Sequence, residues 1–214
     1  MTEWANIVVC LIAFALYEVY IRWVTIRAPM KTARSAHAAI RSNWVKAVMS
    51  RSGTEILVVQ TLRNSVMAAS FMATTAVLAL SGTLTLSGVG NPENELWQSA
   101  RAGSNESIIF AAKLFLLAGS FFVSFLFLAM SVRFFNHVGY LITGAVGSVE
   151  PPRKQTLATA YLNRAGHLYS LGLRAFFSCI PFLAGLFSTF LMLPATLLLI
   201  FVLYWFDRIP QDEE

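Results

Sequence analysis

Long apolar stretches alternate with short polar connections along the chain. Four of these stretches are long enough to cross a bilayer, over about residues 4–26, 56–87, 108–135 and 176–206. A helix needs about 20 apolar residues to cross a hydrocarbon core of ~30 Å. The pattern therefore predicts an all-α membrane protein, a bundle of four transmembrane helices that forms one domain over residues 1–214.

The last apolar run contains two prolines and allows two interpretations. Pro181 and Pro194 divide it into short pieces, which fits either a kinked single crossing or a re-entrant hairpin. An interior proline removes a backbone hydrogen bond and kinks a helix. Because residues 180–206 have about the length of one tilted crossing, we expect a kinked single span.

The connections at 31–51 and 152–171 also have a helical pattern. In the first, Ile40, Trp44 and Val48 recur every four residues, with basic residues on the flank. In the second, apolar positions repeat at similar spacings after two prolines that suit a helix start. Helices with one apolar face lie at a membrane surface. We expect each connection to form an interfacial amphipathic helix on the cytoplasmic side.

The basic residues are concentrated in two connections. Residues 22–51 hold seven Lys and Arg and no acid, and residues 133–174 hold five against one acid. The loop at 88–107 and the tail after residue 206 are mainly acidic. Short loops rich in Lys and Arg stay in the cytoplasm. This asymmetry predicts a multi-pass protein of the cell (inner) membrane, with cytoplasmic basic loops and with both termini and the 88–107 loop outside.

Composition and motifs argue against a soluble enzyme. Hydrophobic residues make up 57% of the chain and charged residues only 13%, whereas soluble domains carry about 25% charged residues. Three scattered histidines and two cysteines lack metal-ligand spacing, and we find no catalytic or nucleotide-binding motif. We therefore expect no enzymatic activity and no cofactor. Topology explains the basic residues, so we expect no nucleic-acid partner.

A polar segment, residues 60–65, opens the second apolar run and is a candidate site. Its polar groups need partners, because an unsatisfied polar group in hydrocarbon costs several kcal/mol. They could form a basic, amide-lined mouth for anions or lipid phosphates, or a polar contact that fastens this helix to a neighbour. The candidate mouth comprises Gln60, Arg63, Asn64, Arg133, Asn136, Arg164 and Arg174.

Small and hydroxyl residues follow the polar segment. Ala69, Ser70, Ala73 and Thr74 would allow a close helix–helix seam, or they could line a conduit with hydroxyl groups. Earlier in the chain, Glu18 lies four residues before Arg22. This spacing favours a pair on the helix surface, although an ionisable group at membrane depth can also couple ions or protons.

The segment 59–65, continuing through Met67–Ser70 to Ala73–Thr75, resembles the opening of the membrane-protein family called domain of unknown function 599. Similar blocks occur at 131–136, 172–176 and 202–207. The resemblance implies a four-span membrane protein without an established activity. It also implies a polar signature made of Arg63, Asn64, Arg133, Asn136 and Arg174.

Two functional hypotheses follow. In the first, the protein self-associates into a pore or conduit for a small solute such as an anion, with the basic mouth at its cytoplasmic end. In the second, it is an accessory or scaffold subunit of a larger membrane complex. The expected partners are anionic lipid headgroups at the cytoplasmic leaflet, together with further copies of the chain or a partner membrane subunit.

Overall fold

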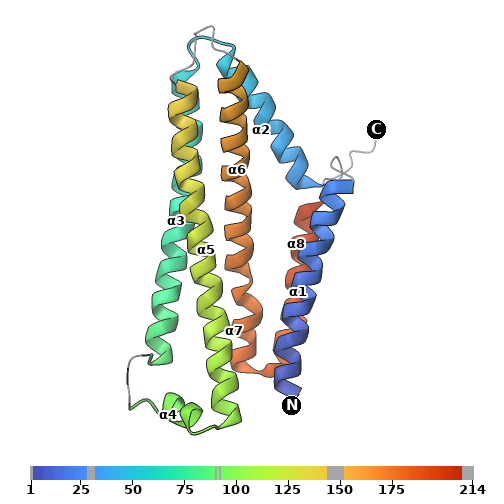
Figure 1. Ribbon diagram of the computed structural model, residues 1–214, viewed down its shortest axis with the longest axis vertical. Coiled ribbons are helices and arrows are strands. Elements are labelled where there is room, and N and C mark those ends of the chain that lie inside the picture. Colours follow the sequence, from blue (N-terminus) through green and yellow to red (C-terminus); the bar gives the residue numbers. More distant parts are fainter. Residues whose placement is uncertain (1, 28–31, 90, 92, 144–151, 209–214) are drawn as a thin grey trace.

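The computed structural model describes residues 2–27, 32–89, 91, 93–143 and 152–208, which are almost entirely helical (Figure 1). The helices are α1 (Thr2–Arg27), α2 (Ala33–Met49), α3 (Glu55–Ser87), α4 (Glu95–Arg101), α5 (Asn105–Thr143), α6 (Pro152–Phe177), α7 (Cys179–Phe187) and α8 (Thr189–Asp207). The predicted all-α class is confirmed.

Among the residues that the structure describes, five helical stretches are long and apolar enough to cross a membrane. They cover residues 3–27, 55–87, 105–143, 153–187 and 189–207, where the fourth stretch joins α6 to α7. The first three correspond to the first three predicted spans. The predicted fourth span corresponds to parts of two stretches.

The last apolar run is a helical hairpin, and the predicted single kinked span is wrong. Ser188 adopts an extended conformation between α7 and α8, with φ −158° and ψ 131°. Pro194 lies inside α8 without ending it. The 19 residues of α8 rise about 28 Å, which is enough for one crossing, and α7 continues the candidate span that α6 begins.

The hairpin makes α8 run parallel to α1. At one end of the pair, Lys113 of α5 bonds to both Glu3 and Thr189, at 3.3 Å and 2.8 Å. At the other end, the Tyr17 hydroxyl donates to Asp207. The start of α1 and the end of α8 therefore lie at opposite ends of this helix pair (Figure 1), whereas the sequence predicts both termini on one side of the membrane.

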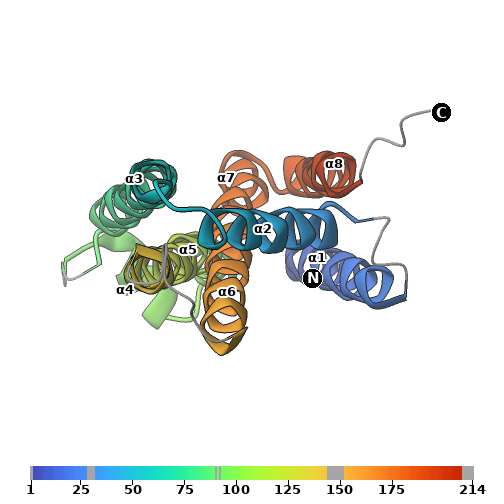
Figure 2. The same cartoon turned by 90° about the horizontal axis from the view of Figure 1, so that it is seen from above.

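The helices α3, α5 and α6 extend well beyond the upper ends of α1 and α8 (Figure 1). With 33 and 39 residues, α3 and α5 are about 50 and 58 Å long. Their upper parts pack with α2 and with the first half of α6 around a common apolar core: Val45, Val48, Val58, Leu62, Phe135, Val138, Ile142, Ala158, Leu162 and Ala165. The predicted helices at 31–51 and 152–171 are present, but each packs into this bundle. In the view from above, α2 crosses the end of the bundle (Figure 2).

Small residues bring α5 and α6 close together. A Cβ atom on Gly172 would lie 2.6 Å from Cγ of Leu128 and 3.3 Å from its backbone nitrogen. Buried Ser124 and Ser131 donate hydrogen bonds of 2.8 Å to the carbonyl oxygens of Gly172 and Ala165. Lipid offers no hydrogen-bond partner to a serine hydroxyl. Hydrogen bonds to the carbonyl oxygens of a neighbouring helix satisfy these hydroxyl groups instead.

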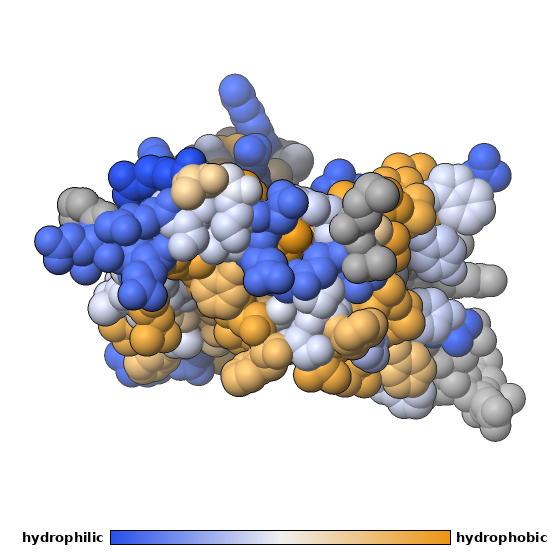
Figure 3. Space-filling model, turned by 90° about the horizontal axis from the view of Figure 1, so that it is seen from below, coloured by the Kyte–Doolittle hydropathy of each residue, from blue (hydrophilic) through white to orange (hydrophobic). Residues whose placement is uncertain are grey.

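The end that carries α4 is mixed in character. Seen from below, hydrophilic residues gather at the left of this end, and hydrophobic residues lie below and to the right of them (Figure 3). Along the sides of the molecule, large apolar side chains are exposed, such as Leu86 at 89%, Phe115 at 78% and Phe190 at 86%. An apolar outer surface of this kind suits contact with lipid.

Candidate functional site

A charge network joins α1, α6 and α8. Arg174 is buried at 8% exposure, and its Nη1 donates to Oε1 of Glu18 at 2.6 Å. Its Nη2 donates to both carboxylate oxygens of Asp207, which also accepts a hydrogen bond from the Tyr17 hydroxyl. A buried arginine requires such partners, since an unpaired charge would cost several kcal/mol. This arrangement fixes the end of α8 against α1 and α6.

The sequence pattern gave little sign of this network. Asp207 follows an apolar run directly, and the single-span prediction placed it on the far side of the membrane from Arg174. The sequence spacing favours an ion pair between Glu18 and Arg22, four residues away. In the structure Glu18 instead accepts a hydrogen bond from Arg174, 156 residues later. The hairpin explains both differences, because it returns Asp207 to the level of Arg174.

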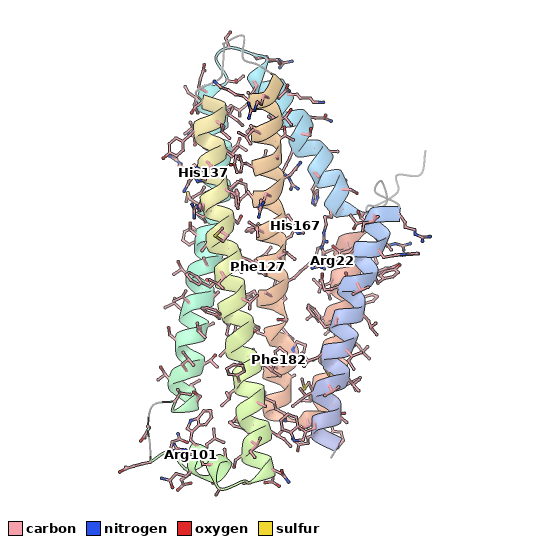
Figure 4. The ribbon with its side chains drawn as sticks, viewed as in Figure 1. Arg22, Arg101, Phe127, His137, His167 and Phe182 are labelled. Carbon is pink, nitrogen blue, oxygen red and sulfur yellow. The ribbon has the colours of Figure 1, made fainter. Side chains whose placement is uncertain are left out.

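A cavity of about 460 Å³ lies below the network, between α1 and the group formed by α5, α6, α7 and α8. We call it the chamber. Its walls are mainly apolar, and three charged residues, Glu18, Arg22 and Arg174, line it as well. In Figure 4, Phe182 lies low in the molecule and Arg22 near the upper end of α1. The chamber is therefore apolar along its length and charged at its upper end.

The charged end of the chamber has unused hydrogen-bonding capacity. Oε2 of Glu18 is buried and has no hydrogen-bond partner among the described residues. The Arg22 side chain is exposed. Ligand cavities of 300–1,000 Å³ typically combine apolar walls with a few polar groups that orient the ligand.

A second, smaller pocket of about 230 Å³ lies between α2 and α6 and shares no lining residue with the chamber. We call it the basic pocket. Its lining residues are Arg34, His37, Ala38, Arg41, Asn163, Gly166, His167 and Ser170. Nε of Arg41 donates to Oδ1 of Asn163 across it at 3.0 Å. Figure 4 marks His167 on α6.

Of the seven residues of the predicted mouth, only Arg174 belongs to the charge network. The other six, namely Gln60, Arg63, Asn64, Arg133, Asn136 and Arg164, are exposed. The Arg164 guanidinium lies over the Phe134 ring, 5.1 Å from its centroid. Within one chain, then, the mouth residues lie on outer faces of α3, α5 and α6.

The four predicted seam residues lie on different sides of α3. Ala69 and Ala73 are buried where α3 packs on α5. Ser70 is half-buried and Thr74 is exposed. The alanines therefore take part in a helix–helix seam, whereas Thr74 faces outward.

The described residues contain no group of three or more His, Cys, Asp or Glu side chains that could hold a metal ion. Both cysteines are buried and free, with Cys10 on α1 and Cys179 on α7.

The comparison with protein families matches residues 5–211 to the family described as "Protein of unknown function, DUF599". This match covers nearly the whole chain, so the protein belongs to that family. Neither the curated proteins nor the solved structures include a match.

Proposed function

We propose that this DUF599 member is a non-enzymatic, multi-pass membrane protein that binds an amphiphilic molecule in the chamber. The observation that carries the proposal is an apolar cavity of about 460 Å³ that has charged groups at one end. Such a cavity matches a molecule with a hydrocarbon body and a polar end. Leu11 and Phe115 line the chamber and are exposed at 41% and 78%, so a ligand can enter from the hydrocarbon phase.

The charged end restricts the chemistry of the ligand. Arg22 can pair with an anionic group, because it is exposed and lines the chamber. The unpartnered Oε2 of Glu18 can accept a hydrogen bond from a hydroxyl or an ammonium group. The ligand class is therefore a lipid or lipid-like molecule whose polar end carries an anionic group next to a hydrogen-bond donor.

Native mass spectrometry of the protein extracted with its lipids tests this proposal. We expect an amphiphile bound to the wild type and about tenfold less of it on a Gly119→Leu variant, an affinity loss equivalent to about 1.4 kcal/mol. Gly119 lines the chamber, and no described atom lies within 4 Å of a Cβ built there, so leucine would fill the cavity.

Gly82→Leu is the matched control, because Gly82 of α3 is equally open and does not line the chamber. It should leave the bound amphiphile unchanged. Equal occupancy in the wild type and in Gly119→Leu would contradict the proposal.

We also propose that the end of the molecule with α2 faces the cytoplasm. This end carries the two connections rich in Lys and Arg, which resist translocation. The charge network then lies near the cytoplasmic interface. The start of α1 faces outward, and the end of α8 faces the cytoplasm.

Labelling of introduced cysteines with a membrane-impermeant maleimide tests this orientation. Ser52, Ser104 and Arg208 are exposed and can each be replaced by cysteine, while the native cysteines are buried. In intact cells we expect labelling of Ser104→Cys alone. Ser52→Cys and Arg208→Cys should react only after permeabilisation. Labelling of Arg208→Cys together with Ser104→Cys would instead support the four-span topology predicted from the sequence.

Self-association into a conduit is the second candidate, and the outer face of α3 favours it. Asn64, Ala68, Thr75 and Gly82 are all exposed at spacings of four and seven residues, on one side of the helix. Small residues on such a face allow two membrane helices to approach closely. In the same mass spectra, this candidate predicts multiples of the 23.6 kDa chain that Gly82→Leu reduces to single copies. A single copy bound to a different protein would favour an accessory subunit.

A further inference from the structure

The basic pocket has a composition that the amphiphile chamber does not explain. Each wall comes from one helical face, with residues at i, i+3, i+4 and i+7. From α2 these are Arg34, His37, Ala38 and Arg41, and from α6 they are Asn163, Gly166, His167 and Ser170. Two guanidiniums, two imidazoles, an amide and a hydroxyl thus surround one space. No acidic side chain of the described residues lines it.

Small residues create the space between the two helices. A Cβ atom on Gly166 would lie 2.6 Å from Nη1 and 2.8 Å from Cζ of Arg41. The Arg41 guanidinium therefore lies against the α6 backbone, where Asn163 holds its Nε. Ala38 contributes only a methyl group to the opposite wall. Glycine at position 166 therefore leaves room for the Arg41 guanidinium beside α6.

The positive charge in the pocket is not fully compensated. Nη2 of Arg34 is buried and has no hydrogen-bond partner in the described part of the chain. Burial lowers the pKa of the Arg34 and Arg41 guanidiniums, and the nearby positive charge of Arg174 lowers that of Arg34 further. The acids Glu18 and Asp207 also act on Arg34, but both already bond to Arg174. A buried donor on a charged group is stabilised by an acceptor, and an anion in the pocket could supply one.

We propose that the basic pocket binds a phosphate group. Its tetrahedral oxygens can accept hydrogen bonds from donors on both walls at once, which a planar carboxylate does less well. Arginine forks match phosphate geometry, and the Ser170 hydroxyl and the imidazoles supply further donors. The group can belong to free phosphate or to a lipid headgroup, because in the proposed orientation α2 starts near the cytoplasmic leaflet. This site goes beyond the amphiphile chamber and does not depend on it.

Two experimental arms separate the sources. The full-length protein is placed in nanodiscs of phosphatidylcholine, and inorganic phosphate is titrated in by calorimetry. In the second arm, nanodiscs also contain phosphatidic acid, and bound lipid is counted by native mass spectrometry. We expect binding in at least one arm. Binding of inorganic phosphate would indicate that the ligand is a free anion. Binding of phosphatidic acid without binding of inorganic phosphate would indicate a lipid headgroup. In that arm, Arg34→Gln and Arg41→Gln should each weaken binding about tenfold.

Arg153→Gln is the matched charge control, since Arg153 lies on α6 and is exposed outside the pocket. It should leave the affinity unchanged. No binding in either arm would overturn the proposal, and so would an equal loss with Arg153→Gln, which would indicate nonspecific attraction.

A second variant keeps both charges and changes only the shape. Gly166→Ala forces the Arg41 guanidinium away from α6, so we expect about a tenfold loss of affinity without any loss of charge. Gly139→Ala is its control, because a Cβ there makes an ordinary contact of 3.7 Å with Leu62 Cδ1. The thermal midpoint of each variant shows whether it is folded. A folded Gly166→Ala protein that binds like the wild type would overturn the proposal.

Discussion

Arg174→Met is expected to destabilise the folded protein by about 3–5 kcal/mol, the usual cost of removing one partner from a buried ion pair. The substitution leaves the side chains of Glu18 and Asp207, exposed at only 19% and 14%, without a positive partner. It also releases the end of α8 from α6. The unfolding midpoint in detergent micelles, followed by the helical circular-dichroism signal, measures the effect.

Two further variants show whether the network or the lost side chain is responsible. Arg164→Met removes an exposed arginine from the same helix and should cost no more than about 1 kcal/mol. The triple variant Arg174→Met, Glu18→Gln, Asp207→Asn removes all three charges together. It should be more stable than Arg174→Met alone, because no unpaired charge remains. Equal losses for Arg164→Met and Arg174→Met would contradict this account.

Gly172→Ala is expected to destabilise the bundle by about 1–3 kcal/mol, a typical cost of overpacking. The added Cβ would lie 2.6 Å from Leu128 Cγ and 3.3 Å from the Leu128 backbone nitrogen. The leucine side chain can turn aside, but the backbone can yield only if α5 and α6 separate. Separation would also lengthen the bond from Ser124 to the Gly172 carbonyl. The same micelle unfolding measurement applies.

Gly119→Ala makes the same chemical change on α5 where no described atom lies within 4 Å of the new Cβ. It should be neutral, or stabilising by up to about 1 kcal/mol through helix propensity. Combining Gly172→Ala with Leu128→Ala should cost less than the sum of the two, since the shorter side chain gives the new methyl group room. Strict additivity would show that Leu128 is not the residue in conflict.

Hydropathy predicted the first three spans well because each is bounded by polar connections. It failed at the fourth because the α7–α8 turn consists of Ser188 alone, between two apolar helices. Because no charge, glycine or polar loop marks this turn, a helical hairpin and one long membrane-spanning helix would have the same hydropathy pattern. Hydropathy also placed the end of the third span at Phe135. In the structure α5 continues to Thr143, and its Val138 and Ile142 pack into the upper core.

The site was harder to predict than the fold. Arg174 was selected from the sequence, but it was grouped with residues that lie on other helix faces. Arg63, for example, is exposed although it directly follows the buried Leu62. Glu18 has a nearby arginine at the right spacing, yet a buried guanidinium on another helix is its partner. Which face a residue occupies, and which distant residue it meets, depends on helix packing that hydropathy does not encode.

The parallel arrangement of α1 and α8 also sets an order of events during synthesis. Glu18 emerges first, Arg174 follows 156 residues later, and Asp207 comes 33 residues after that. Until α8 is made, Glu18 is the only carboxylate of the network available to Arg174. The final helix joins an arginine that is already paired with Glu18, so a chain that stops before Asp207 leaves Arg174 with one of its two carboxylate partners.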